Sequence, residues 1–348
     1  MLLFIILTVF SGVVIDHLLI QSDLGAAYIN SPLHNRVFSL SKRFFTSNTA
    51  FNNSYTNGNG YSNTTNTTNP QFTYKAVVAY QPKDRNDQIY QKLKDSILSP
   101  TGEDNYFITS NSISDVYAAV ADGVGGWAEL GYDSSAISRE LCNSMSKFTS
   151  TLSGRKDGIS PRDILDFAYN KIKEEGVVKV GSTTAIVAHF KDNGLLEVAN
   201  LGDSWCGVFR DSKLVFETKF QTVGFNAPYQ LSIIPDSISK GQKYIQNTPA
   251  DADNYSFQLQ KNDVILLATD GVTDNIGTED MELFLKDNED QILQDLESVS
   301  KDFVSKVVSL SKDPEYPSVF AQELSKLTGK TYGGGKQDDI TVVVVKAM

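Results

Sequence analysis

The sequence predicts an α+β fold in which antiparallel sheets pack together and helices lie on the outside. Apolar, β-branched segments between residues 182 and 218 follow one another through turns too short for a helical crossover, so they must pair as an antiparallel meander. Further strand-like segments stand before and after two long helical segments, so the helices have sheets to cover. This pattern excludes a parallel, Rossmann-type sheet.

Residues 1–71 are predicted to precede the folded domain as two segments of different composition. Residues 1–22 are mostly apolar and are interpreted as a targeting or membrane-anchor segment, because a bilayer span takes about 20 apolar residues and a secretory signal core about 7–15. Residues 23–71 form a linker that is first basic and then rich in Asn, Ser and Thr. Such a composition buries too little apolar surface to fold, so we expect a flexible tether.

The basic part of this linker favours a mitochondrial protein. No acidic residue occurs between Asp23 and Asp84, whereas basic residues stand among Ser and Phe in residues 36–46, which is typical of mitochondrial transit peptides. We therefore expect the globular part on the matrix side of the mitochondrion. The alternative is a transmembrane helix over residues 1–20, which would anchor the chain in the membrane of the nuclear envelope or endoplasmic reticulum.

Residues 72–348 are predicted to form one domain. Strands are expected where β-branched and aromatic residues gather, at residues 75–80, 106–110, 116–122, 182–190, 195–203, 205–210, 213–218, 263–270 and 340–345. Helices are expected at residues 134–152, 161–175, 290–311 and 318–328. The second helix should begin at Pro161, because the fixed φ of proline suits the first helical position.

Charge and histidine content exclude several classes of function. The chain carries 42 acidic against 31 basic side chains, a net charge of −11, and has no run rich in Lys or Arg, so nucleic-acid binding is not expected. Of three histidines, His189 alone falls in the domain, inside a strand-like segment. A Ser-His-Asp nucleophile or a His-rich zinc site is therefore not expected, because too few histidines are present. Hydrolytic chemistry in this chain would depend on carboxylates and metal ions.

Aspartates stand at the ends of the strand-like segments. Asp122, Asp203 and Asp270 each close an apolar run, and Asp338 and Asp339 lead directly into the last one. Because buried strands deliver such residues to the rim of a core, we expect their carboxylates to gather there. Several carboxylates at one rim repel each other unless a cation lies among them. The sequence therefore predicts a site for a hard divalent cation.

Five short acidic motifs occur in order along the chain, and the last four contain these aspartates. They are GEDNYFI at residues 102–108, ADGVGGW at 121–127, GDS at 202–204, TDGVTDN at 269–275 and GGGKQDDITVVVV at 333–345. A single Asp-Gly after a strand is ordinary turn chemistry. The five together, in this order, resemble the metal-dependent (Mg/Mn) Ser/Thr protein phosphatases of type 2C over residues 72–348, and the first two are most similar to the mitochondrial branch of that family.

This resemblance implies an α-β-β-α sandwich, two mostly antiparallel sheets packed face to face with helices outside, and a centre that holds two Mg²⁺ or Mn²⁺ ions. It implies that Asp122 bridges the two ions and that the Gly123 carbonyl binds one of them. Asp270 and Asp338 would bind the other, and Glu103 would reach its ion directly or through water. Ligation by oxygen alone suits Mg²⁺ or Mn²⁺. Catalysis would depend most on Asp122 and Asp270.

The remaining acidic residues of the motifs have subordinate roles in this resemblance. Asp203 would help to hold a weaker third ion. Asp338 rather than Asp339 aligns with the ligand of the family, although the two residues are adjacent. Asp104 is expected to orient the ligands without joining them, and Asp274 to be a turn or helix-cap residue.

The function that the resemblance implies is hydrolysis of phosphoserine and phosphothreonine in phosphorylated proteins. Two ions about 3.5–4 Å apart acidify a shared water, and the resulting hydroxide attacks phosphorus in line, so that no phosphoenzyme forms. Residues 219–254 fall where the family has a variable flap beside the active site, which either contacts protein substrate or packs on the core. The alternative function is a membrane-tethered pseudophosphatase that acts as a binding module.

Two positions depart from the pattern of many type 2C enzymes. Val124 stands in place of a His after the Asp-Gly, which is a proposed general acid, and Ser99 stands where a phosphate-binding Arg precedes the Glu by four residues. Protonation of the leaving group is then expected to fall to a metal-bound water, and phosphate binding to another cation, with Lys336 and Arg139 as candidates. The mitochondrial branch has the same Val, so Val124 does not indicate an inactive enzyme.

Overall fold

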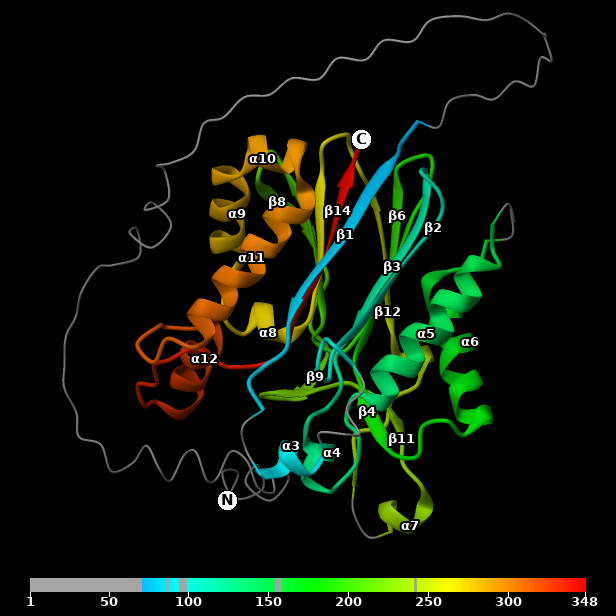
Figure 1. Cartoon of the computed structure of the whole chain (residues 1–348), viewed down its shortest axis with the longest axis vertical. Helices are drawn as coiled ribbons and strands as arrows, with labels where there is room; N and C mark the ends of the chain where they lie inside the picture. Colours follow the sequence, from blue (N-terminus) through cyan, green and yellow to red (C-terminus); the bar gives the residue numbers. More distant parts are fainter. Residues whose placement is uncertain (1–70, 86–87, 94–98, 154–157, 241–242) are drawn as a thin grey trace, which may run out of the picture. The chain divides into compact units, whose positions relative to one another are not determined.

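The computed structural model describes residues 71–85, 88–93, 99–153, 158–240 and 243–348 (Figure 1). Two five-stranded antiparallel sheets pack face to face, and helices cover the outer face of each sheet (Figure 1). The predicted α-β-β-α sandwich is therefore confirmed. The segments predicted at residues 1–22 and 23–71 lie outside the described residues, apart from residue 71.

The first sheet has the strand order β1-β14-β13-β7-β8, and every neighbouring pair is antiparallel. All of β14 is buried, because both faces of this strand are covered. Val343 and Val345 face the second sheet, whereas Val344 contacts the helical layer. The strands are β1 (Tyr74–Gln81), β7 (Trp205–Arg210), β8 (Lys213–Glu217), β13 (Val264–Ala268) and β14 (Ile340–Ala347).

The second sheet has the strand order β12-β6-β5-β3-β2. Along β3 the side chains alternate as strand geometry requires: Ala118 and Val120 belong to the core between the sheets, and Ala119 and Ala121 to the core under the helices. Asp122 comes two residues after Val120 and so continues the row that points between the sheets. The strands are β2 (Asn105–Ser112), β3 (Asp115–Ala121), β5 (Ala185–Phe190), β6 (Leu195–Leu201) and β12 (Asp253–Gln258).

Helices form the two outer layers (Figure 1). α5 (Ala136–Ser150) and α6 (Pro161–Glu175) cover the second sheet, and α9 (Thr278–Asp287), α10 (Glu289–Gln294) and α11 (Leu296–Ser311) cover the first. α6 begins at Pro161, as the sequence predicts. The Asp163 N–H donates to Ser160 Oγ at 3.2 Å, and the Ser160 N–H donates to Asp163 Oδ2 at 2.9 Å, which closes a capping box.

Shorter elements connect the layers near the strand ends. The region predicted as a flap, residues 219–254, contains more regular structure than its sequence indicates: a β9–β10 hairpin and a strand, β11, that pairs with β4. The short elements are α3 (Gln88–Leu93), α4 (Gly126–Glu129), β4 (Gly181–Thr183), β9 (Thr222–Gly224), β10 (Ala227–Pro228), β11 (Leu231–Ile233), α7 (Asp236–Ser239), the 3₁₀ turn η2 (Pro249–Asp251), α8 (Asp270–Thr273) and α12 (Val319–Thr328).

The helix predicted at residues 290–311 is divided into α10 and α11. Asp295 leaves the helical conformation, with φ −142° and ψ 82°, and its carboxylate accepts the N–H of Ser298 at 3.2 Å. An aspartate that caps a new helix in this way interrupts an apolar pattern that reads as continuous. The strand β12 and the helix α9 were not predicted.

The meander predicted at residues 182–218 is antiparallel but divides between the two sheets. β6 belongs to the second sheet and β7 to the first, and the chain crosses between them at residues 202–204. Gly202 makes this crossing with φ 107°, and a Cβ at this position would lie 2.7 Å from Thr184 Cγ2. Asp203 therefore lies at the point where the two sheets are joined.

The prediction of a transmembrane helix is corrected by the structure. No helix in the described part of the chain is long and apolar enough to cross a membrane. The longest of them, α11, has 16 residues, whereas a span takes about 20 apolar residues. Residues 1–20, where that helix was predicted, lie outside the described residues.

Candidate metal centre

The strand ends that carry the aspartates meet at one end of the sandwich. β14 pairs with both β1 and β13, so the residues before β14 lie beside those that follow β1 and β13. The Thr269 N–H, just before Asp270, donates to the carbonyl oxygen of Thr341 at 3.1 Å. The Lys83 N–H, just after β1, donates to Asp339 Oδ1 at 2.8 Å. Pairing between strands distant in sequence thus gathers the acidic residues.

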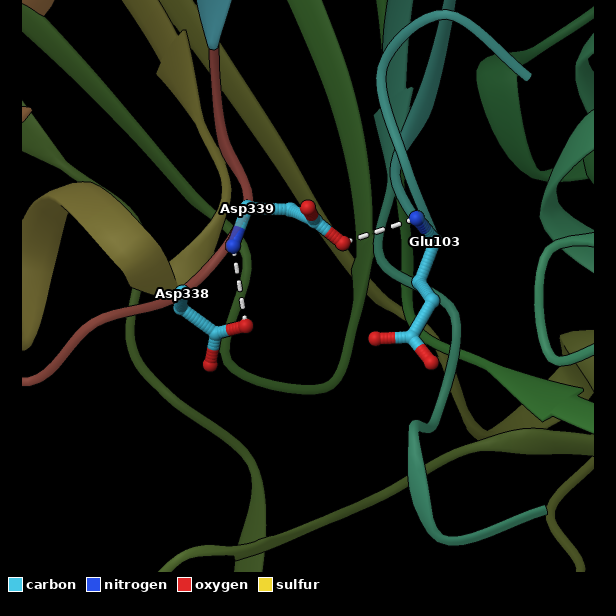
Figure 2. Close-up of side chains that lie close together, drawn as sticks. All are labelled: Glu103, Asp338 and Asp339. Atoms are coloured by element: carbon cyan, nitrogen blue, oxygen red, sulfur yellow. Dashed lines mark hydrogen bonds between the residues drawn. The ribbon is translucent and has the colours of Figure 1, made fainter. Parts of the chain in front are cut away.

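Glu103, Asp338 and Asp339 each place one carboxylate oxygen within 4.8 Å of the others (Figure 2). The Asp339 N–H donates to Asp338 Oδ1 at 2.9 Å, and the Glu103 N–H donates to Asp339 Oδ2 at 2.8 Å. Figure 2 shows the carboxylates of Glu103 and Asp338 pointing into the same space, while that of Asp339 is turned toward the Glu103 backbone. Asp339 therefore ties the Glu103 loop to the start of β14.

Glu103 is held firmly by its neighbours, and only 2% of its surface is exposed. The hydroxyl of Ser134 donates to Glu103 Oε1, and Lys83 Nζ lies 2.7 Å from Oε2. The Tyr90 hydroxyl approaches both carboxylate oxygens, at 3.3 and 3.4 Å. The Ser138 hydroxyl donates to the Glu103 carbonyl oxygen at 2.6 Å. These contacts fix the carboxylate in one orientation.

The turn formed by Asp122 and Gly123 leaves no room for a side chain at the second position. The Gly123 N–H donates to the Glu103 carbonyl oxygen at 3.2 Å. A Cβ on Gly123 would lie 2.5 Å from the Ser134 carbonyl oxygen and 2.6 Å from that of Glu103. The Thr184 N–H donates to the Asp122 carbonyl oxygen at 2.9 Å. The glycine thus lets the Asp122 turn pack directly against the Glu103 backbone.

Asp270 is the first residue of α8 and stands two residues after the end of β13. Its carboxylate lies near enough to that of Asp122 to raise the pKa of Asp122, after the larger effect of burial. Asp203 and Asp274 lie near enough to Asp270 for mutual repulsion. Lys336 Nζ lies 2.9 Å from Asp270 Oδ2 and also contacts the carboxylate of Asp274. Together with Glu103, Asp338 and Asp339, these residues bring the acidic side chains of all five sequence motifs into one group.

Three basic side chains lie among these carboxylates. Besides Lys83 and Lys336, Arg85 contributes Nη2, which lies 2.8 Å from Asp339 Oδ2. Lys83 and Arg85 both stand over the ring of Tyr90, at 5.7 and 5.1 Å from its centre. Lys83 and Arg85 were not predicted as site residues. In the sequence, only their position shortly after β1 could have indicated these two residues. The pairing of β1 with β14, which brings them to the acidic group, becomes apparent only in the structure.

Burial raises the pKa of five of the carboxyl groups, and neighbouring carboxylates raise each of them further. The pKa values of Asp104 and Asp122 lie well above their ordinary range. The pKa rises to about 8 for Asp203, to about 7 for Asp274 and to about 6 for Asp339. The three basic side chains therefore do not offset all of the repulsion among these carboxylates.

Asp338 differs from these five groups. Burial would raise its pKa as well, but the ammonium groups of Lys83 and Lys336 hold it well below the ordinary value. Burial alone would lower the pKa of both lysines, but Asp338 and the other carboxylates near each lysine raise it well above the usual range. Asp338 therefore stays ionised, and both lysines stay charged, at any pH near neutrality.

The residues of this group fit hard divalent cations. Asp104 Oδ1 is buried and has no hydrogen-bond partner among the described residues. All the side-chain acceptors are carboxylate oxygens, which Mg²⁺ and Mn²⁺ prefer. Carboxylates exceed basic side chains by five, since the group comprises Glu103, Asp104, Asp122, Asp203, Asp270, Asp274, Asp338 and Asp339 against Lys83, Arg85 and Lys336.

Comparison with known proteins agrees with this geometry. Residues 114–348 match the family model described as Stage II sporulation protein E (SpoIIE). The protein phosphatase 2C homolog 7, mitochondrial, of Saccharomyces cerevisiae is 64% identical over 320 residues, which cover 90% of this chain and 93% of the yeast protein. The chain belongs to the protein phosphatase 2C family. It is accordingly an enzyme, a protein-serine/threonine phosphatase.

Two further relatives of this phosphatase cover most of its folded part. The protein phosphatase PTC7 homolog fig of Drosophila willistoni is 36% identical over 248 residues, 70% of this chain and 76% of that protein. The X-ray structure of the photosystem II phosphatase PBCP superposes with a TM-score of 0.61 at 26% identity, and covers 78% of this chain and 98% of that one. The resemblance stated from the motifs is therefore confirmed at the level of the family.

The structure places the remaining predicted residues as follows. Lys336 lies inside the acidic group, whereas Arg139 pairs with Asp133 at 3.2 Å and Glu140 at 3.1 Å on α5. The Ser99 hydroxyl is engaged locally, 2.7 Å from Thr101 Oγ1. Asp274 directly follows α8 and contacts Lys336.

Proposed function

We propose that this phosphatase hydrolyses phosphoserine and phosphothreonine in phosphoproteins with water activated by two divalent cations, without a phosphoenzyme. The observation that carries the proposal is the excess of buried carboxylates at the strand ends, together with their raised pKa values. When bound, two such ions supply an acidified water and stabilise the charge that develops on the phosphate. The scarcity of histidine and the buried state of both cysteines support metal chemistry over a covalent nucleophile.

The proposed ligands of the two ions are Asp122, the Gly123 carbonyl, Asp270, Asp338 and Glu103. Asp122 would bridge the ions, and the proximity of its carboxylate to that of Asp270 supports this role. Glu103 and Asp338 point into one space (Figure 2), which supports their assignment to a shared centre. The Gly123 turn is packed so tightly that its carbonyl has a defined direction. We propose Mg²⁺ or Mn²⁺ for both positions.

A weaker third ion would be held by Asp203 with Asp270. The raised pKa of Asp203, about 8, comes first from burial and then from Asp270 and Asp274, so a cation at this point would relieve the repulsion. Asp104 would orient the other residues, because Thr269 Oγ1 donates to its Oδ2 at 2.8 Å.

Lys336 is the proposed phosphate-binding cation. It lies against Asp270 and Asp338, whereas Arg139 is engaged with acidic residues of its own helix region. Its Nζ also lies 3.3 Å from Asn226 Oδ1, in the turn between β9 and β10. The ammonium group therefore stands between the proposed metal ligands and the flap, where a phosphoprotein would approach.

The test is hydrolysis of a phosphoserine peptide by the full chain, with Mn²⁺ and with an excess of chelator. We expect turnover that requires Mn²⁺ and that Asp270→Asn lowers by at least about 10²-fold. Asp287→Asn makes the same chemical change at an exposed residue of α9 and should leave turnover near wild type. Phosphoryl transfer to an added alcohol would argue for a phosphoenzyme. A folded, metal-bound chain without any turnover would instead favour the binding-module alternative.

We further propose that the phosphatase acts in the mitochondrion, on the matrix side. The yeast relative, 64% identical over nearly all of both chains, is named as mitochondrial, and the acid-poor, basic composition of residues 36–46 agrees with import. In fractionated cells the protein should resist added protease until the inner membrane is broken. Recovery at the nuclear envelope or endoplasmic reticulum would refute the proposal.

A further inference from the structure

Both carboxylate oxygens of Asp338 are engaged by lysines. Lys83 Nζ lies 2.9 Å from Oδ1, and Lys336 Nζ lies 3.5 Å from Oδ2. Lys83 comes from the segment after β1 and Lys336 from the loop before β14, so two separate parts of the fold converge on one carboxylate. Both lysine side chains are largely buried, with exposed fractions of 18% and 17%.

The same two ammonium groups engage other proposed metal ligands. Lys83 Nζ lies 2.7 Å from Glu103 Oε2, and Lys336 Nζ lies 2.9 Å from Asp270 Oδ2. Three proposed ligands are thus joined to basic side chains. An ion that takes Asp338 as a ligand shares that carboxylate with two ammonium groups, and it is repelled by each ammonium that remains nearby.

Each lysine has a second set of partners outside the proposed ligands. Lys336 Nζ contacts Asp274, lies 3.3 Å from Asn226 Oδ1 and lies 5.2 Å from the ring centre of Phe320. Lys83 Nζ lies 5.7 Å from the ring centre of Tyr90. Either ammonium group can therefore move away from Asp338 and keep favourable contacts.

We propose that Lys83 and Lys336 set the affinity of the phosphatase for its metal ions by competing with those ions for Glu103, Asp270 and Asp338. The proposal rests on the ligand assignment of the proposed function. The lysines hold the carboxylates together and lower metal affinity at the same time. Removing one of them should therefore move metal affinity and intrinsic stability in opposite directions, which a purely structural role would not do.

The experiment measures Mn²⁺ affinity by calorimetry on the full chain after chelator treatment, and urea unfolding in chelator. Lys336→Met keeps the aliphatic stem and removes the charge. We expect it to bind Mn²⁺ at least about tenfold more tightly, since one positive charge near a divalent cation costs that much even at the dielectric constant of water. It should also unfold at lower urea concentration in chelator. Lys83→Met is the second variant and should behave alike.

Two controls separate competition from other effects. Lys336→Arg keeps the charge and should stay near wild-type affinity. Lys213→Met removes an exposed lysine of β8, whose Nζ lies 2.6 Å from Glu282 Oε2. It should change neither the Mn²⁺ affinity nor the urea concentration at which the chain unfolds. If both Met variants fold and bind Mn²⁺ no more tightly than wild type, the inference is overturned while the proposed function stands. If the wild-type chain binds no Mn²⁺, both are overturned.

Discussion

Gly102 offers a sharp test of how the Glu103 loop is positioned. It adopts φ 84°, and a Cβ at this residue would overlap the carboxylate of Asp339. Gly131 adopts nearly the same φ, 85°, but a Cβ there would have nothing within 4 Å. Gly102→Ala and Gly131→Ala therefore share the backbone strain and differ only in the collision with Asp339.

The expected effects follow from these contacts. Left-handed strain at an alanine costs about 1–2 kcal/mol, so Gly131→Ala should lose about that much free energy of unfolding. In Gly102→Ala the displaced Asp339 carboxylate also leaves the N–H groups of Glu103 and Lys83. An unpaired buried donor costs about 1–3 kcal/mol. With two such donors, Gly102→Ala should be about 2–6 kcal/mol less stable than Gly131→Ala.

Urea unfolding of both variants in the same buffer measures the difference. Mn²⁺-dependent hydrolysis of the phosphoserine peptide gives a second readout, because Glu103 moves with its backbone. We expect Gly102→Ala to lose most activity and Gly131→Ala to keep it. Equal stability and equal activity of the two variants would refute the role given to Asp339.

Three other outcomes are expected. In chelator, the free energy of unfolding should fall as pH rises from about 4 to 8. The raised pKa values of Asp203, about 8, and Asp339, about 6, make the folded chain bind more protons than the unfolded chain in that window. Saturating Mn²⁺ should remove this pH dependence, and its absence in chelator would contradict the pKa shifts. Asp295→Ala removes the cap of α11 and should cost about 1 kcal/mol in thermal unfolding without changing Mn²⁺ affinity. Gly123→Ala should abolish hydrolysis, whereas Gly126→Ala, with nothing within 4 Å of its Cβ, should not.

Much of the fold was predictable because local patterns and tertiary contacts agree. β3 alternates between two cores, and both of its faces are apolar in sequence. Pro161 and Gly176 bound α6 by backbone preferences that need no tertiary context. The division at Asp295 was not predictable from periodicity, because apolar residues continue on both sides of it and only the cap separates the two helices.

The positions of the acidic residues were predictable where these residues stand at the ends of strands. Asp122 and Asp270 are found at the ends of β3 and β13, as their apolar runs indicate. Lys83 and Arg85 could not be assigned, since they join the site only through pairing of β1 with β14, more than 250 residues away. Asp339 looked like a neighbour of a ligand, and its contacts with the Glu103 and Lys83 backbones appear only in three dimensions.

The claim that the strand-end aspartates hold two divalent ions is tested most directly by counting bound Mn²⁺. Chelator-treated full-length protein should take up two tightly bound Mn²⁺ per chain, with a weaker third at higher concentration. Asp122→Asn, which alters the proposed bridging ligand, should bind fewer than two. Absence of tight Mn²⁺ binding by the wild-type chain, or equal binding by Asp122→Asn, would contradict the assignment.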